Sequence, residues 1–191
     1  MQNYSFLGNF TIKCPFFAFN KYIIYITTMK KKTILGVIMT LIMLAAGSSC
    51  DKIDNKAVPS FTVRIDLGNI ALWNTYGVNG MGDYRIFDRD KRLPSNFPYN
   101  ANTFTGFGGV LLMMGIEEPM AYDLSCPVEA TRDIVLSINP ENFEAVCPRC
   151  GSRYNPLTGD GGPTSGVAIN NKVGMRKYRA IPSNGGYFIT N

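Results

Sequence analysis

Three cysteines in the C-terminal part of the chain have a spacing that suits a metal or redox site. Cys147 and Cys150 form a C-x-x-C pair followed by Gly151, and 20 residues separate Cys126 from Cys147. A C-x-x-C turn directs two thiolates toward one centre, and thiolates are good ligands for zinc and iron. The spacing therefore makes Cys147 and Cys150 candidate ligands of one centre, and Cys126 is the one further cysteine of the predicted domain that is available to it.

The residue types that are missing limit the possible chemistry. The chain contains no histidine, which excludes a Ser-His-Asp triad, a histidine general base and any metal site that needs an imidazole ligand. It also has no phosphate-binding loop, no dinucleotide fingerprint and no clear pair of catalytic carboxylates. We therefore expect an electron-transfer or binding protein rather than a stand-alone enzyme.

Three uses of the cysteines remain open at this stage. In the first, the thiolates bind a metal or an iron–sulfur cluster, and Glu129, Asp123 or water supplies a fourth ligand. In the second, no metal is bound, and two cysteines form a disulfide that leaves one thiol over. In the third, the thiols are redox-active and Arg149 lowers the pKa of a neighbouring cysteine.

The positive charge of the chain is confined to its beginning. Residues 1–49 contain five lysines and no acidic residue, whereas residues 50–191 contain 14 basic and 14 acidic residues. A neutral domain has no general attraction for phosphate backbones, so nucleic acid is not an expected partner.

The basic segment is typical of a bacterial export signal. Residues 29–49 contain Met-Lys-Lys-Lys, then an apolar run at 33–46 and the small residues Gly-Ser-Ser before Cys50. The run is shorter than the roughly 20 residues that cross a bilayer as a helix. The segment resembles a lipoprotein signal, which implies acylation of Cys50 and a lipid-anchored protein of the cell envelope, on its periplasmic or surface side. The alternative is ordinary secretion with a free Cys50.

This signal defines the expected organisation of the chain. We interpret residues 1–28, which contain Cys14, as an upstream mis-start, because an export signal normally opens the chain. Residues 50–60 are polar and are predicted to be a tether. The folded domain is then expected to span residues 61–191.

The domain is predicted to be all-β, a small antiparallel sandwich or barrel. Residues 61–67 alternate between apolar and polar types, as in a half-buried strand. No helical period of useful length is visible at 68–109, and the charged run 88–92 is interpreted as a solvated loop. Further strands are expected at 110–114, 120–124, 134–138, 143–146, 175–181 and 187–190, between turns rich in Gly, Pro and Asn.

The sequence around the cysteines resembles that of Rieske iron–sulfur domains. The similar segments are 123–127, 147–155, 158–160 and 166–168, within a resemblance that covers about residues 108–191. In that family one loop carries C-x-H, a second carries C-x-x-H-G-S-x-[FY], and a later turn covers the cluster. The resemblance implies a cluster-binding loop subdomain, electron transfer to a redox or envelope protein partner, and hydroxyl groups of Ser152 and Tyr154 that tune the centre.

The resemblance fails at the histidine ligands. Val128 stands at the first histidine position and Cys150 at the second, so three thiolates replace the two cysteines and two histidines that hold a Rieske [2Fe–2S] centre. A standard Rieske centre is thereby excluded. Two functions remain: an envelope electron carrier with a non-standard iron–sulfur or metal site, zinc being the alternative ion, and a metal-free binding or structural module of the same fold.

Overall fold

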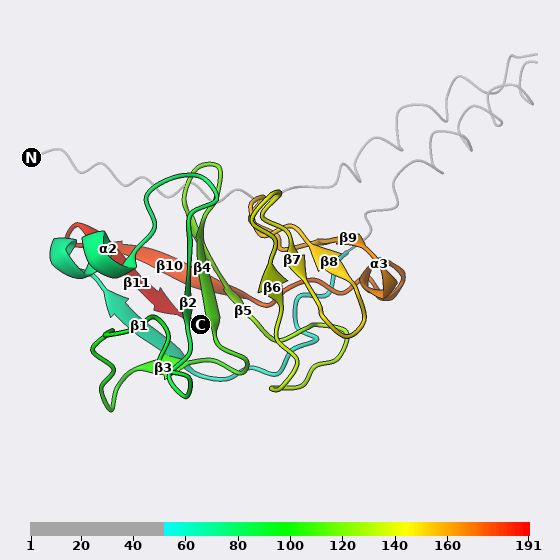
Figure 1. Ribbon diagram of the computed structural model, residues 1–191, viewed down its shortest axis with the longest axis horizontal. Helices are drawn as coiled ribbons and strands as arrows, with labels where there is room; N and C mark the ends of the chain where they lie inside the picture. Colours follow the sequence, from blue (N-terminus) through cyan, green and yellow to red (C-terminus); the bar gives the residue numbers. More distant parts are fainter. Residues whose placement is uncertain (1–51) are drawn as a thin grey trace, which may run out of the picture. The chain divides into compact units, whose positions relative to one another are not determined.

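The computed structural model describes residues 52–191, and the predicted upstream segment, signal peptide and lipid-attachment residue Cys50 lie outside them. The described residues form an all-β fold of two antiparallel sheets, which confirms the predicted fold class (Figure 1). The first sheet is a nearly closed barrel with the strand order β2-β4-β5-β10-β11-β1-β3, and the second has the order β6-β7-β8-β9.

The strands of the first sheet are β1 (Val63–Leu67), β2 (Tyr84–Phe87), β3 (Phe104–Thr105), β4 (Val110–Met114), β5 (Pro119–Asp123), β10 (Lys177–Ser183) and β11 (Gly186–Thr190). Those of the second are β6 (Ser137–Ile138), β7 (Ala145–Val146), β8 (Arg153–Tyr154) and β9 (Pro163–Ser165). Two short helices, α2 (Ile70–Tyr76) and α3 (Val167–Asn171), complete the described elements. None of the helices in residues 52–191 is long and apolar enough to span a membrane.

Strand β4 separates two hydrophobic cores, which explains its uninterrupted apolar sequence. Val110 and Leu112 point into a first core with the inner residues of β1, whereas Leu111 and Met113 point into a second core. Successive side chains of a strand face opposite sides of the sheet, so a strand covered on both sides needs no polar alternation. The second core lies between β4 and β5 and the small sheet, and it includes Cys126 and Cys147.

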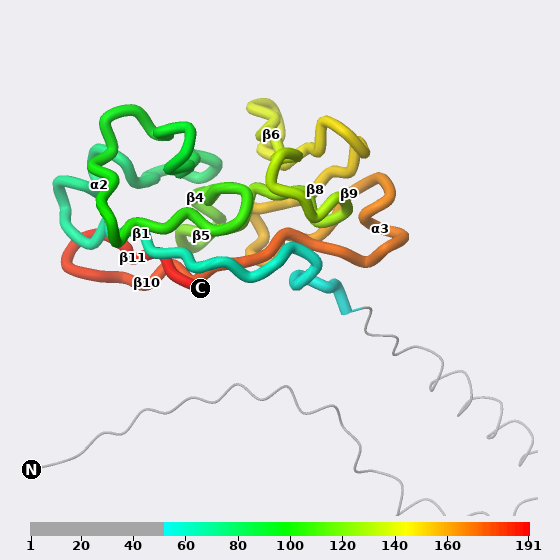
Figure 2. Tube along the Cα trace, turned by 90° about the horizontal axis from the view of Figure 1, so that it is seen from below, coloured from blue at the N-terminus to red at the C-terminus, as the bar shows by residue number. Residues whose placement is uncertain are grey.

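The two cores correspond to the two ends of the domain. Figure 2 shows β6, β8, β9 and α3 at one end and α2, β10 and β11 at the other, with β4 and β5 between them. The cysteine-bearing loops therefore belong to the end built on the small sheet.

Strand predictions were most accurate where the apolar pattern was long. The prediction at 110–114 matches β4, and those at 61–67, 120–124, 175–181 and 187–190 overlap β1, β5, β10 and β11. At 134–138 and 143–146 only the two-residue strands β6 and β7 form. Strands β2, β3, β8 and β9 lie outside the segments predicted to be strands, so these four were missed.

The absence of a helix from 68–109 was a wrong prediction. Helix α2 begins after Asn69, whose side-chain oxygen accepts a hydrogen bond from the N–H of Leu72, and ends before Gly77, whose N–H donates to Trp73. An Asn cap and a terminal Gly are the usual signals for helix ends. With seven residues the helix is too short for a clear period, and it is held by burial of Trp73 in the first core.

The charged run 88–92 is only partly the solvated loop that was predicted. Asp88 pairs with Leu93 in an isolated bridge, is buried, and accepts hydrogen bonds from the N–H groups of Asp90 and Lys91. The other residues of the run are exposed. Asp88 therefore closes a tight loop at the end of β2.

The polar segment predicted to be a tether makes contacts that a free linker would lack. Asp54 forms a parallel bridge with Val173, and its N–H donates to Lys172. Val58 is fully buried, and its carbonyl accepts a hydrogen bond from the Arg176 side chain. The chain therefore contacts the domain from Asp54 onward, four residues after Cys50.

Glu144 links three segments of the small sheet. Its carboxylate accepts hydrogen bonds from Thr164 at 2.7 Å, Asn142 at 2.8 Å and Arg153 at 3.2 Å. The hydrogen bond from Thr164 is the main reason why the pKa of Glu144 lies below its usual range, although burial opposes the change. The carboxylate thus joins β8 and β9 to the segment that leads into β7.

We expect replacement of Glu144 by Gln to destabilise the domain at neutral pH only. A carboxylate whose pKa is lowered by folding stabilises the fold above its unfolded pKa, and that contribution is lost as the pH falls through the folded pKa. Because the site is solvent-accessible, the effect should stay below about 1 kcal/mol. Denaturant unfolding of Glu144→Gln should differ from wild type at pH 7, and the difference should shrink steadily as the pH is lowered through the acidic range, while Glu141→Gln serves as the exposed control. A difference that is independent of pH would contradict this role.

Candidate metal site

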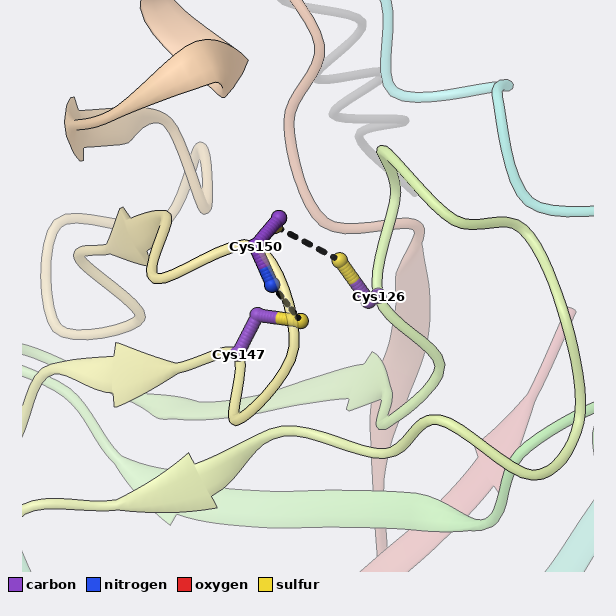
Figure 3. A group of neighbouring side chains, drawn as sticks. All are labelled: Cys126, Cys147 and Cys150. Carbon is purple, nitrogen blue, oxygen red and sulfur yellow. Dashed lines mark hydrogen bonds between the residues drawn. The ribbon is translucent and has the colours of Figure 1, made fainter.

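The structure brings the three predicted cysteines together. The sulfur atoms of Cys126, Cys147 and Cys150 all lie within 4.8 Å of one another, and those of Cys126 and Cys150 are 3.7 Å apart. Figure 3 shows Cys126 approaching from one loop and the other two cysteines on the turn that faces it. Cys126 and Cys147 are buried and Cys150 is partly exposed.

Cys147 and Cys150 lie on the tight turn between β7 and β8. The N–H of Cys147 donates to Ser152 and that of Gly151 to Cys147, which closes the turn. Gly151 has a φ of 68°, a left-handed conformation that favours glycine. The N–H of Cys150 points at the sulfur of Cys147 at 3.5 Å. No helix begins at Cys150, and the next element is strand β8, so the pair lacks the helix start of a thioredoxin-like site.

Cys126 opens the loop between β5 and β6. Its N–H donates to Ile134, and its carbonyl accepts from the N–H of Ala130. The hydroxyl of the preceding Ser125 donates to the Thr131 carbonyl at 2.7 Å. These bonds hold the start of the loop in one conformation, so that the thiol points toward the opposite turn.

Asp123 anchors this loop and is not a metal ligand. Its fully buried carboxylate accepts hydrogen bonds from the N–H groups of Phe107, Gly108 and Ser125 and from the Tyr178 hydroxyl, at 2.6–3.0 Å. The prediction of Asp123 as a fourth ligand is therefore wrong. Sequence analysis also missed the partner Tyr178, because nothing local relates two residues 55 positions apart.

Glu129 and Arg149 pair with each other across the two loops. The Arg149 Nε atom lies 3.7 Å from a carboxylate oxygen of Glu129, and 66% of the Arg149 side chain is exposed. Such an exposed ion pair adds little stability. Neither predicted role is visible here: Glu129 does not join the group of sulfur atoms, and Arg149 faces a carboxylate instead of a thiol.

Ser152 connects the cysteine turn to the segment that covers it. Its buried hydroxyl lies 3.3 Å from the sulfur of Cys150 and accepts a hydrogen bond from the N–H of Ala168 at 3.2 Å. Gly166 has a φ of 85°, and a Cβ there would lie 2.8 Å from the Cα of Ser152. The segment 166–168 therefore packs directly on the turn, as the covering turn of the resemblance implies.

Tyr154 lies beneath the site. Its fully buried hydroxyl is 3.9 Å from the sulfur of Cys126. Burial is the main cause that raises the pKa of Tyr154, and the negative charge of an ionised Cys126 raises it further. The phenol consequently stays protonated and can donate its hydrogen toward the sulfur.

Cys126 and Cys150, whose sulfurs are 3.7 Å apart, ionise differently. Burial raises the pKa of the Cys126 thiol to about 12, although the N–H groups of Glu129 and Val128 oppose it. Burial also opposes ionisation of Cys150, but hydrogen bonds from the side chain and backbone of Ser152 and from the side chains of Cys147 and Cys126 together outweigh it and lower the pKa of this thiol. Of these two cysteines, Cys150 therefore forms the thiolate needed for metal ligation more readily.

The ligand set does not fit a standard Rieske cluster. That cluster needs two imidazoles on one of its irons, and the positions where the resemblance would put them hold Val128 and Cys150. Three thiolates with hydroxyl groups beside two of them suit a thiophilic metal centre instead. A cationic centre would also relieve the mutual repulsion of thiolates held this close together.

Comparisons with known proteins yield one structural likeness. No protein-family model and no curated protein matches the chain. Among solved structures, the chain is similar to the ferredoxin of carbazole 1,9a-dioxygenase from Nocardioides aromaticivorans IC177, with 16% sequence identity and a TM-score of 0.35. The similarity covers 69% of this chain and 97% of that one.

Proposed function

We propose that residues 52–191 form a metal-binding domain whose centre is held by Cys126, Cys147 and Cys150, and that with iron in this centre the domain is an electron carrier. The observation that carries the proposal is the mutual proximity of the three sulfur atoms, all within 4.8 Å. Electron transfer is what the resemblance to Rieske domains adds. The partner is then a redox protein of the cell envelope.

The distances between the sulfurs suit ligation of a metal. For metal–sulfur bonds of about 2.3 Å, two sulfurs at the corners of a tetrahedron lie about 3.8 Å apart. The separation of 3.7 Å between the Cys126 and Cys150 sulfurs equals that edge within the precision of the comparison. Little movement is needed to bring the third sulfur to the same distance.

The test is metal analysis with an absorption spectrum on the full chain, purified without oxygen and without chelator. Iron or zinc at one centre per chain is expected. Iron with inorganic sulfide identifies a cluster, iron without sulfide a single-iron centre, and zinc a structural or ligand-binding centre. A chain that holds no metal and takes up neither zinc nor iron on reconstitution would overturn the proposal.

The competing function is a metal-free binding or structural module. It is favoured by the closeness of Cys126 and Cys150, whose sulfurs would need to approach from 3.7 Å to about 2.05 Å to form a disulfide. Peptide mapping without reduction separates the two functions. A Cys126–Cys150 crosslink in freshly isolated protein would support the module, and alkylation of all three cysteines only after metal removal would support the centre.

The hydroxyl of Ser152 should strengthen metal binding without being a ligand. Groups that hydrogen-bond to a ligating atom typically contribute 10–100-fold in metal affinity. We expect Ser152→Ala to weaken zinc binding by roughly that factor, because the Cys150 thiolate loses a donor at 3.3 Å. Competition with a chromophoric chelator measures the change. Ser137→Ala removes an exposed hydroxyl bonded to Val146 and should leave the affinity unchanged. Equal affinities in the two variants would contradict this role.

We propose that Cys50 carries the lipid that anchors the domain at the membrane of the cell envelope. The sequence around the export signal supports this proposal. In bacterial cells, wild-type protein should incorporate labelled fatty acid and fractionate with membranes, and Cys50→Ser should do neither. Labelling of Cys50→Ser at the wild-type level would contradict lipidation at this residue.

A further inference from the structure

We infer that the three-thiolate centre holds a single metal ion whose fourth ligand is a small donor taken from solution, such as a thiol or an imidazole. The inference rests on the proposed function and specifies its coordination. It follows from three features of the described residues: the donors present, the engagement of every nearby carboxylate and hydroxyl, and the side from which the sulfurs are accessible.

The span of the sulfurs points to one ion. All three lie within 4.8 Å of one another, and one pair is already at a tetrahedral edge. In a two-metal cluster, terminal ligands on different metals lie farther apart than two ligands of one metal, because the metal–metal separation adds to their span. A cluster would therefore have to push the Cys126 loop and the Cys147–Cys150 turn apart, against the hydrogen bonds that hold both.

No carboxylate of residues 52–191 joins the three sulfurs. The two carboxylate oxygens of Asp123 accept four hydrogen bonds. Movement of this side chain toward the sulfurs would break its hydrogen bonds to Tyr178 on β10 and to two backbone N–H groups of the 107–108 segment. Glu129 faces Arg149 instead. Neither carboxylate belongs to the group of ligand atoms that the three sulfurs form.

The hydroxyl groups of Ser152 and Tyr154 each lie within hydrogen-bonding distance of a cysteine sulfur. The Ser152 oxygen accepts hydrogen bonds from the N–H of Ala168 and from the Cys150 thiol, and once Cys150 is a thiolate the Ser152 hydroxyl can donate its own hydrogen to that sulfur. Tyr154 lies on the buried side of the site, against Cys126. Both groups support thiolates and leave the fourth position without a protein donor among the described residues.

The fourth position opens toward solvent through Cys150. This residue is partly exposed, and its neighbours Pro148, Arg149 and Gly151 are exposed, whereas Cys126 and Cys147 are buried. Three protein ligands and one exchangeable position are the arrangement that metal sites use to bind molecules from solution, while closed four-ligand sites are structural. Soft or nitrogenous donors suit a thiolate-rich ion.

Cobalt substitution tests this directly. The full chain, kept free of oxygen, is titrated with Co²⁺, and thiolate ligation is read from charge-transfer absorption in the near ultraviolet. The visible d–d bands report the fourth ligand. We expect one cobalt per chain and a saturable shift of the visible bands when 2-mercaptoethanol or imidazole is added, with the charge-transfer absorption retained.

Matched variants identify any ligand from the chain itself. Cys14→Ser, Cys50→Ser and Glu129→Gln should give the wild-type cobalt spectrum before and after addition of 2-mercaptoethanol. A spectrum altered in one of them before any addition would assign the fourth position to that residue and overturn the inference. Visible bands that do not change with either added ligand would also overturn the inference, and so would a stoichiometry of two cobalt ions per chain. Both results would leave the proposed metal-binding function intact. A chain that binds no cobalt, zinc or iron would overturn both.

Discussion

Replacement of Cys147 by Ser is expected to abolish stoichiometric metal binding. Cys147 is buried and its sulfur accepts the N–H of Cys150, so it is both a ligand and the organiser of the turn. Loss of groups that only support a ligand already costs 10–100-fold in affinity, and we expect loss of the ligand itself to exceed about 100-fold. Metal analysis and chelator competition on the full chain measure the effect.

Controls for Cys147→Ser separate ligation from folding. Serine is nearly the same size as cysteine, so circular dichroism of the variant should remain that of a β protein. Cys14→Ser, outside the described residues, should keep the wild-type metal content. Cys126→Ser should resemble Cys147→Ser, because the two come from opposite loops and both are required. Full metal content in Cys126→Ser would show that Cys147 and Cys150 alone bind the ion, and would contradict the three-thiolate centre.

Replacement of Asp123 by Asn is expected to cause a large loss of stability. The four donors around the carboxylate come from the 107–108 segment, the Cys126 loop and β10. Asn offers one acceptor oxygen, and its amide hydrogens would face two of these donors. Leaving buried partners of a charged acceptor unsatisfied costs about 3 kcal/mol, which for a domain of this size lowers the Tm by roughly 10 °C.

Two companion variants make the Asp123 prediction specific. Tyr178→Phe removes one donor out of four and should cost less, about 1.5–3 kcal/mol, as for other hydrogen bonds to a charged group. Asp66→Asn changes an exposed carboxylate that accepts only from the nearby N–H of Gly68, and it should be within about 0.5 kcal/mol of wild type. Thermal unfolding of metal-free protein compares all three. A Tm for Asp123→Asn within a degree of that for Asp66→Asn would contradict the anchoring role.

The accuracy of the strand predictions followed the burial of each segment. Strand β4 was predicted with its correct bounds because a short uninterrupted apolar run is typical of a strand that is buried on both faces. Strand β6 forms only at the end of the strand predicted at 134–138, and the two-residue strand β8 was missed, because the pairing of such short strands depends on partners elsewhere in the chain. Helix α2 had recognisable end signals at Asn69 and Gly77, but seven residues are too few to show a period.

Asp123 shows how a correct motif can be given a wrong role. The segment 123–127 was recognised from its residue types, and a carboxylate three positions before a cysteine is a reasonable ligand candidate. Its actual role depends on Phe107, Gly108 and Tyr178, which lie 15 to 55 positions away. A hydrogen-bond network of that range has no local signature.

Composition and spacing exclude an imidazole ligand and indicate the three candidate thiols of the domain, and the resemblance to Rieske domains adds the hydroxyls of Ser152 and Tyr154. Composition and spacing also establish the all-β class, since short alternating segments between turns bury their apolar faces only by pairing. Three features of the site come from the packing of β4 and β5 against the small sheet. Cys126 lies close to the C-x-x-C turn, Asp123 and Glu129 lie outside the group of sulfur atoms, and Cys150 is partly exposed whereas the other two cysteines are buried. Contacts between loops 20 residues apart depend on where both sheets place their strand ends, and no property of either loop by itself encodes that position.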